Sequence, residues 1–388
     1  MRIPTVTSLA VATLIAFGCS KTPEDKLIGE WKGTDSGGQT ATQGASVGSM
    51  SSILQSVKDK YKLGAIIFSA DKNGVPLFRT AIGNSTVGEP ATTDMHFRIG
   101  AVGWQYLTEL MLLMVEQGQL SLTDPVSKWY PNYPGANLAP VRMLAASSTG
   151  FGEYITPPVF LNEVGADPFR VWSADDLITR SLPPYQTPQF TNPGQNWEYS
   201  HTPFVMLGAI LEKVSGKPYA TLLKEMILDP LKFSDTRLQF DANPQLPVLH
   251  TLTEDTFQDS TFWNPSWVSW AALTSNVCEL AAWNRAFGAG TLLSSNSQKE
   301  VTSQVNVGLG PNTSQRYFGL GTMVFAPWIV QRASYWGMQT STAYDPTTGI
   351  SIVVTVSLTP QTPVNVAAVT EIISKVSEVL TPDHPVPM

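Results

Sequence analysis

The stretch HFRIGAVGWQYLTELMLLMVEQGQL, residues 96–120, decides the fold of this chain. It runs from a polar strand end at His96 through Gly100 into a strongly apolar segment. Apolar residues recur in that segment at the spacing of one helix face, namely Leu107, Leu110, Met111 and Met114. We therefore expect a helix that begins just after Gly100 and packs this face into a core.

Length and composition indicate a globular protein. The 388 residues suffice for one large domain or two ordinary ones, and an apolar fraction of 43% excludes overall disorder. The net charge is -7 and no basic stripe is present, so nucleic-acid binding has no electrostatic support.

Cysteine and histidine are sparse. Cys19 and Cys278 are the two cysteines, and no disulfide framework follows from them. The four histidines, at positions 96, 201, 250 and 384, form no local metal motif. We therefore predict no metal and no cofactor; a zinc site assembled from distant residues is the alternative that such a search would miss.

The N-terminus, MRIPTVTSLAVATLIAFGCS, carries one Arg, a short apolar run and a small residue before Cys19. This pattern is typical of a secretory signal rather than a membrane span. LIAFGC resembles a bacterial lipobox, although Ala16 stands where Leu is usual. We expect a signal peptide over 1–19, lipidation of Cys19 and, since Ser20 follows, an outer-membrane lipoprotein. An ordinary signal peptide and a periplasmic protein are the alternative.

The remaining chain divides into a tether and one domain. Residues 20–48 are polar and rich in Gly, Ser and Thr, which predicts a flexible tether. The domain is expected over 49–382. SSILQSVKDKY, residues 51–61, predicts its first helix, and two apolar runs around Asn73-Gly74 predict a hairpin.

Helices, loops and strands follow in that order. Residues 202–228 predict two amphipathic helices that break at Gly216-Lys217-Pro218. Strands are expected over 316–326, 328–336 and 349–358, and a closing helix over 362–380. The pattern predicts an α+β sheet whose first and last strands meet, with a helical insertion over about 120–300.

Several stretches resemble the penicillin-recognising serine hydrolases, which include class C β-lactamases, DD-peptidases and related esterases. They are HFRIG before a helix, VEQGQLSLTDPVSKWYPNYPGA, VRMLAASSTGFGEY, NPGQNWEYSHTPFVMLGAILEKVSGKPY and NPSWVSWAALTSNVCELAAWNRAFGAGTLLS. The resemblance covers about 50–380. It implies an antiparallel sheet flanked by helices beside a mostly helical subdomain, with the site in the cleft between them.

Three motifs carry the chemistry of that family. The first, Ser-x-x-Lys, places a hydroxyl and an amine on one helix face. Here its Ser falls on Ala101, which has no nucleophile, and its Lys on Trp104, whose indole only donates a hydrogen bond. The second, Tyr-x-Asn or Ser-x-Asn, falls on Tyr199-Ser200-His201, so that the Tyr remains and the Asn is His201.

The third motif, Lys-Thr-Gly or His-x-Gly, falls on Tyr335-Trp336-Gly337, where only the Gly matches. The resemblance also implies an oxyanion hole of backbone N–H groups, here those of Ala101 and Met338. Replacing side chains leaves these groups in place, so the cleft could still bind a carbonyl or carboxylate without cleaving it.

No other part of the sequence offers a replacement for the Ser and Lys that the first motif lacks. The Ser-x-x-Lys match from Ser69 to Lys72 spans the predicted hairpin rather than a helix start. Ser147 and Ser148 are interpreted as loop hydroxyls more readily than as a new nucleophile. Tyr199 and His201 are the residual candidates for acid–base chemistry, against the simpler interpretation of a buried Tyr beside a partly exposed His.

Six tryptophans fall near the cleft that the resemblance to the family implies. They either fill the core or form a platform on which a ligand stacks. They are Trp104, Trp197, Trp263, Trp267, Trp270 and Trp336.

Three hypotheses follow. The leading one is an inactive envelope lipoprotein of this fold that binds a cell-wall fragment, derived from peptidoglycan, or a protein partner, and that meets the membrane through a lipid at Cys19. The second is a hydrolase with non-standard catalytic residues. The third is a purely structural or assembly subunit.

Overall fold

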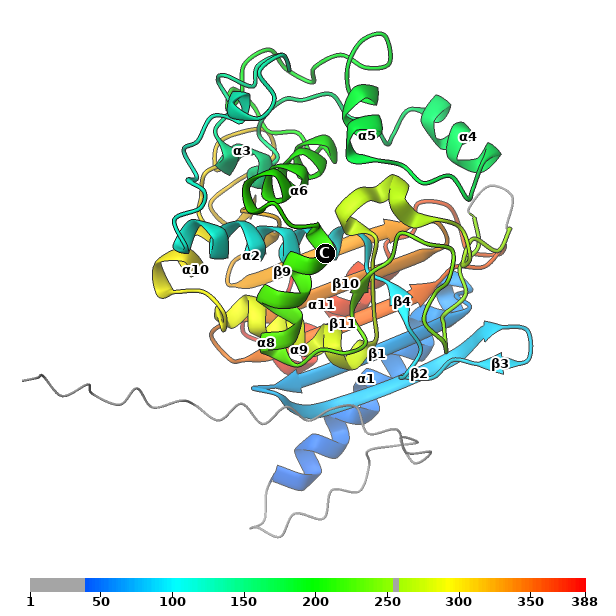
Figure 1. The fold of residues 1–388 in the computed structure, drawn as a ribbon. Helices are drawn as coiled ribbons and strands as arrows, with labels where there is room; N and C mark the ends of the chain where they lie inside the picture. The colour runs from blue at the N-terminus through cyan, green and yellow to red at the C-terminus, as the bar shows by residue number, and fades with distance from the viewer. Residues whose placement is uncertain (1–38, 254–257) are drawn as a thin grey trace, which may run out of the picture.

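The structure is a computed structural model that describes residues 39–253 and 258–388. A large antiparallel sheet lies between the helices α1 and α11 on one face and the remaining helices on the other (Figure 1). No helix in these residues combines the length and the apolar character that a bilayer span needs.

The large sheet has eight strands in the described part of the chain, in the order β3-β2-β1-β11-β10-β9-β8-β7. The strands are β1 Ala65–Lys72, β2 Val75–Thr86, β3 Glu89–Pro90, β7 Arg316–Phe318, β8 Met323–Phe325, β9 Trp328–Tyr335, β10 Met338–Asp345 and β11 Ile350–Ser357. A smaller sheet, in the order β4-β6-β5, contains β4 Phe97–Arg98, β5 Arg237–Leu238 and β6 Leu273–Ser275.

Most of the helices lie in the sequence between the first strands of the large sheet, β1 to β3, and its last strands, β7 to β11. The α-helices are α1 Gln39–Tyr61, α2 Gly103–Glu116, α3 Val141–Ala146, α4 Pro158–Ala166, α5 Ala174–Arg180, α6 Thr202–Ser215, α7 Tyr219–Leu223, α8 Asp229–Leu231, α9 Val277–Ala289, α10 Ser295–Val301 and α11 Ala368–Leu380. Short 3₁₀ helices occur at η1 Gly100–Val102, η2 Val126–Lys128 and η4 Pro265–Ala271, and a π-helical turn at η3 Lys224–Leu228.

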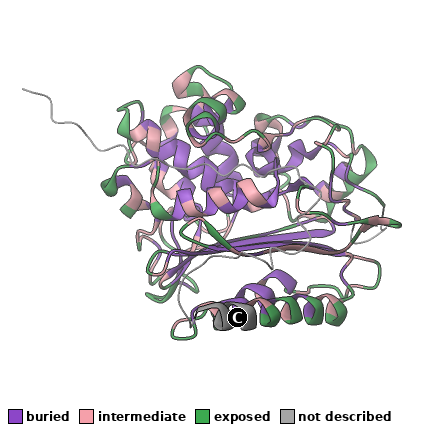
Figure 2. Cartoon of the chain, turned by 90° about the horizontal axis from the view of Figure 1, so that it is seen from below, coloured by how far each residue is buried: buried purple, intermediate pink, exposed green. Residues whose placement is uncertain are grey.

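Two apolar cores lie on the two faces of the large sheet. Alternate side chains of a strand point to opposite faces. Ile66 and Phe68 of β1 therefore join α1 and α11, whereas Ala65 and Ile67 join the larger core on the helical side. Figure 2 shows the buried sheet edge-on between the helices, whose outward residues are exposed.

Several predicted elements are confirmed. β1 and β2 form the hairpin, with Asn73 and Gly74 both at positive φ in its turn. The first and last long strands meet, since β1 pairs with β11 from Ala65↔Ser357 to Lys72↔Ile350. The helix break at Gly216 is a left-handed cap at the end of α6, a conformation that glycine adopts without strain.

Two boundaries differ from the predictions. Helix α1 begins at Gln39, so the end of the predicted tether is helical and the first helix starts well before Ser51. Helix α11 begins at Ala368 rather than at 362, because a turn at Thr359–Thr362 precedes it. The predicted signal peptide, Cys19 and residues 20–38 lie outside the described residues.

Candidate functional site

The turn at the start of the decisive helix is tightly packed against the sheet. It begins as the 3₁₀ turn η1 and continues as α2 from Gly103. Gly100 has φ +51°, and a Cβ atom there would lie 2.8 Å from the Cβ of Ala333 on β9. Glycine therefore lets the turn meet the strand. Ala101 follows, half-buried, with only a methyl group to offer.

Trp104 joins the first motif position to the second. Its side chain is fully buried, and its ring stacks on Phe204 with centroids 4.6 Å apart and an interplanar angle of 10°. Its indole Nε1–H donates a hydrogen bond of 2.6 Å to the hydroxyl oxygen of Tyr199. The position that the sequence analysis predicts for the family's Lys thus holds an apolar ring whose one polar group is satisfied.

Tyr199 is held as a neutral phenol. Burial raises the pKa of its hydroxyl, the charge of Glu153 raises it further, and the hydrogen bond from Trp104 lowers it only partly. Trp104, which donates to this hydroxyl, offers no ammonium group to stabilise a phenolate. The Tyr199 oxygen is therefore a poor proton acceptor at neutral pH.

His201 is paired with a carboxylate that the sequence analysis did not single out. Its Nδ1 lies 2.9 Å from Oε2 of Glu153, and its backbone N–H donates to the same oxygen at 2.8 Å. Burial opposes the charge on Glu153, yet the charge and hydrogen bonds of His201, with a backbone N–H, hold the pKa of Glu153 below its usual value. A carboxylate on Nδ1 fixes the ring orientation and leaves Nε2 of a neutral imidazole as a base.

The third motif position forms the turn between β9 and β10. Tyr335 is buried, and its hydroxyl accepts a 3.2 Å hydrogen bond from Arg98. The Arg98 guanidinium also donates to the backbone oxygens of Ser260, Thr261 and Trp263. A cation thus lies near this motif, but its donors serve internal acceptors.

Trp336 and Gly337 complete that turn. Trp336 is half-buried and contacts Trp263 and Trp267, with ring centroids 5.2 and 4.6 Å away. Gly337 has φ +72°, and a Cβ atom there would lie 1.9 Å from the backbone oxygen of Leu252. Met338, the other predicted oxyanion residue, begins β10 and is buried, and η1 contacts both β9 and β10.

The alternative serine positions are structural. Ser69 is buried on β1 and Lys72 is exposed at its end; three residues apart on a strand, they point to opposite faces. The Ser147 hydroxyl accepts the backbone N–H of Ser200 at 2.9 Å. Ser148 is buried in the loop that follows α3.

Half of the six tryptophans lie in the apolar core. Trp104, Trp267 and Trp270 are buried, and Trp197, Trp263 and Trp336 are half-buried. Trp197 and Trp270 donate their indole N–H groups to the backbone oxygens of Ala146 and Val205.

Neither of two cavities in the described residues opens between the motif positions. One has a volume of about 10 Å³ and lies beside Arg98 and Met338. The other has about 420 Å³ and reaches Gly337 but not Ala101, Trp104 or Tyr199. The same residues contain no group of three or more His, Cys, Asp or Glu side chains that could hold a metal ion.

Comparison with known proteins identifies a family whose model matches most of the chain. The family model described as Beta-lactamase matches residues 53–375. Penicillin-binding protein 4* of Bacillus subtilis is 24% identical over 191 residues, which cover 49% of this chain and 41% of that protein. Esterase EstB of Burkholderia gladioli is 26% identical over 196 residues, covering 47% and 48%. The chain thus spans about half the length of the curated relatives it matches.

Solved structures share the fold over most of the chain. A D-stereospecific amidohydrolase from Streptomyces sp. superposes with a TM-score of 0.74 at 21% identity, covering 84% of this chain and 97% of that one. D-amino acid amidase from Ochrobactrum anthropi SV3 gives 0.73 at 20%, covering 86% and 98%. At these identities the likeness shows the fold alone.

Proposed function

The chain belongs to the β-lactamase family, and we propose that it is a catalytically inactive member that acts by binding at the cell envelope. One observation carries the proposal. Trp104 fills the position of the family's Lys, stacked on Phe204 and hydrogen-bonded to Tyr199, beside an Ala101 that has no nucleophile.

Magnitudes support inactivity. Loss of the nucleophile in a serine hydrolase costs on the order of 10⁶ in turnover, and about 10³–10⁴ over water survives from the oxyanion hole and binding. Here the proton acceptor is replaced as well, and the Tyr199 phenol is held neutral. The usual acyl-enzyme cannot form on the methyl group of Ala101.

The proposed binding role is supported by the features of the fold that the substitutions do not remove. The family model matches residues 53–375, and buried apolar side chains surround Trp104. We propose a cell-wall-derived ligand or a protein partner, bound outside the filled space between Ala101 and Tyr199. We also propose the envelope location, with Cys19 lipidated; mass spectrometry of the mature N-terminus should find a diacylglyceryl group on Cys19. An unmodified cleaved N-terminus would reject the anchor.

The test of inactivity is covalent labelling of the purified chain. Fluorescent penicillin and a fluorophosphonate probe should leave no label that survives denaturation. An active serine β-lactamase is the positive control, and heat-denatured chain is the negative one. Stoichiometric labelling of the native chain would overturn the proposal.

A second candidate, a hydrolase with non-standard residues, is favoured by the Glu153–His201 pair. A half-buried carboxylate that orients an imidazole is an arrangement in which His can act as a general base. Nitrocefin, short-chain esters and D-amino acid amides should then be turned over, and His201→Gln should abolish turnover. Turnover no higher than that of heat-denatured chain would remove this candidate.

A purely structural role is favoured by the same closure around Trp104. It predicts no ligand and a binding partner in the assembled envelope. Cross-linking of the chain in its native membrane should then capture that partner while no small-molecule ligand binds, and a chain that captures no partner would remove this candidate.

A further inference from the structure

Two arginines lie on the face of the large sheet that carries α1 and α11. Arg316 of β7 pairs with Phe325 of β8, and Phe325 pairs with Trp328 of β9. Cross-strand partners point to the same face, and so do alternate residues of one strand. Phe325, Trp328 and Val330 belong to the core beneath α1 and α11. Arg316 and Arg332 therefore point to this face, whereas the motif positions lie with the core on the other face.

Each guanidinium has a contact that holds it along the surface of the sheet. Nη1–H of Arg332 donates a 3.4 Å hydrogen bond to the hydroxyl oxygen of Thr370, in the first turn of α11. The guanidinium carbon of Arg316 lies 5.1 Å from the centre of the Phe325 ring. A cation at such a distance is attracted to the face of an aromatic ring. Both guanidinium groups are therefore positioned before any ligand arrives.

The two positive charges also affect each other. Burial lowers the pKa of Arg332, and the charge of Arg316 lowers it further. The two guanidinium groups thus repel each other on one face of the sheet. An anion that contacts both groups would relieve this repulsion.

Neither arginine forms an ion pair with a carboxylate in residues 39–253 and 258–388. Glu371, which follows Thr370 on α11, is bound by Lys60 and Lys375, each at 2.7 Å. Both arginine side chains are exposed, so a solute can reach them. In a chain with a net charge of -7, two neighbouring cations without an acidic partner indicate a site for an anion.

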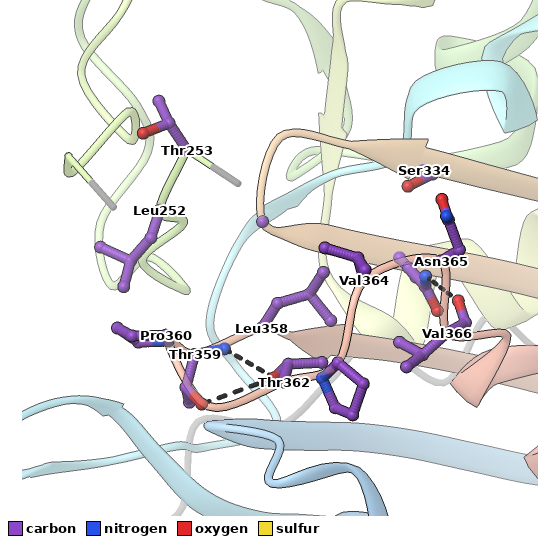
Figure 3. Close-up of a pocket in the computed structure, with 13 residues that line it drawn as sticks. Leu252, Thr253, Ser334, Leu358, Thr359, Pro360, Thr362, Val364, Asn365 and Val366 are labelled. Carbon is purple, nitrogen blue, oxygen red and sulfur yellow. Dashed lines mark hydrogen bonds between the residues drawn. The ribbon is translucent and has the colours of Figure 1, made fainter. Parts of the chain in front are cut away.

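The arginines lie beside the loop that leads to α11. Ser334 is two residues after Arg332 on the same strand and the same face, and Figure 3 shows it near Asn365 and Val366 of that loop. Val364 of the same loop is 84% exposed. An exposed apolar side chain beside cations suits the surface of an anionic membrane, where headgroup phosphates lie next to apolar chains.

We propose that Arg316 and Arg332, together with the hydroxyl of Thr370, bind a phosphate group. A guanidinium presents paired N–H donors that match the oxygens of a phosphate. The Thr370 hydroxyl accepts from Arg332 and can donate its own proton to the phosphate. The phosphate belongs either to a lipid headgroup or to a soluble phosphate. This site goes beyond the proposed function, since it lies on the other face of the sheet and does not depend on chemistry at Ala101.

Phosphorus NMR titration of inorganic phosphate against the full chain measures the soluble ligand. At low ionic strength, phosphate should bind saturably with a Kd on the order of 1 mM, and added sodium chloride should weaken it, because salt screens exposed charges. Arg332→Gln should raise the Kd by about tenfold or more. Arg170→Gln, at an exposed position before α5, is the matched control and should leave the Kd unchanged. Urea unfolding confirms that each variant is folded.

Sedimentation with vesicles identifies the source of the phosphate. Vesicles of phosphatidylcholine with and without phosphatidylglycerol are compared, in a Cys19→Ser background so that no lipid on Cys19 contributes. Binding that requires phosphatidylglycerol and is lost when Arg316→Gln and Arg332→Gln are combined assigns the site to a lipid headgroup. Binding of inorganic phosphate without binding of vesicles assigns it to a soluble phosphate.

Two results would overturn the proposal. One is the absence of binding both by inorganic phosphate and by the anionic vesicles. The other is binding of either probe that persists unchanged in the folded variant that combines Arg316→Gln and Arg332→Gln. Covalent labelling at the motif positions is a separate measurement, so the failure of this proposal and the failure of the proposed function are distinguishable.

Discussion

Replacing Glu109 should stabilise the protein increasingly as the pH rises. Glu109 lies on α2 and is fully buried, and neither carboxyl oxygen has a hydrogen-bond partner among the described residues. Burial, with a smaller contribution from the charge of Glu116, raises the pKa of Glu109 from 4.5 to about 8. At neutral pH the folded protein therefore keeps this group protonated, whereas the unfolded chain ionises it.

The size of the effect follows from proton linkage. A carboxyl with a raised pKa contributes full stability below its unfolded pKa, and that contribution is lost as the pH rises toward the folded pKa. Each pKa unit is worth about 1.4 kcal/mol. Between pH 4.5 and 7 the loss is about 3 kcal/mol, and it reaches about 5 kcal/mol above pH 8.

Urea unfolding at pH 5, 6, 7 and 8 measures this directly. Glu109→Met removes the titrating group at a similar volume, so its stability advantage over the wild type should grow by about 3 kcal/mol from pH 5 to pH 8. Glu378→Gln, at an exposed position on α11, is the control and should run parallel to the wild type. A Glu109→Met profile parallel to the wild type would refute the assignment of a buried, neutral carboxyl.

Three further predictions concern the site residues. Trp104→Ala should lower the free energy of unfolding by about 3–5 kcal/mol, because it leaves a cavity beside Phe204; a urea midpoint close to that of the wild type would contradict the packing described. The pKa of Glu153 is lowered in the folded protein, so the stability that this carboxylate contributes is present above its unfolded pKa and is lost in acid. Glu153→Gln should therefore reduce the loss of thermal stability below about pH 4.5. The same loss of stability in acid in both proteins would contradict the pairing with His201. Gly337→Ala should destabilise by more than about 1 kcal/mol, because φ is positive and Leu252 leaves no space; calorimetric melting at the wild-type temperature would show that the turn can relax.

The sequence predicts those parts of the fold in which local pattern and tertiary role agree. Asn73-Gly74 adopts the positive φ values that its hairpin needs, whatever surrounds it. Strand β10, MQTSTAYD, escaped prediction because it is buried on both faces yet carries hydroxyls instead of alternating apolar residues. Thr340 and Thr355 satisfy each other at 2.9 Å, a pairing that exists only once the strands are in register.

Some residues of the candidate site could be predicted from the sequence, whereas others could not. The resemblance to the family predicts motif positions at Ala101, Trp104, Tyr199 and Gly337, because order and spacing along the chain suffice for such a prediction. The Glu153–His201 contact joins residues 48 apart, and no local pattern couples them. The cavity beside Gln339 was likewise invisible, since it depends on how a loop seats over the end of a sheet.

Acylation by an active-site probe tests the central claim most directly. Fluorescent penicillin is incubated with the wild-type chain and with Ala101→Ser, which restores the hydroxyl but leaves Trp104 in the position of the Lys. We predict no denaturation-resistant label on either protein, because the wild type has no hydroxyl at position 101 and the variant has an indole, which cannot accept a proton, in place of the Lys. One label per wild-type chain, mapped by peptide mass spectrometry to any residue of the cleft, would contradict the account.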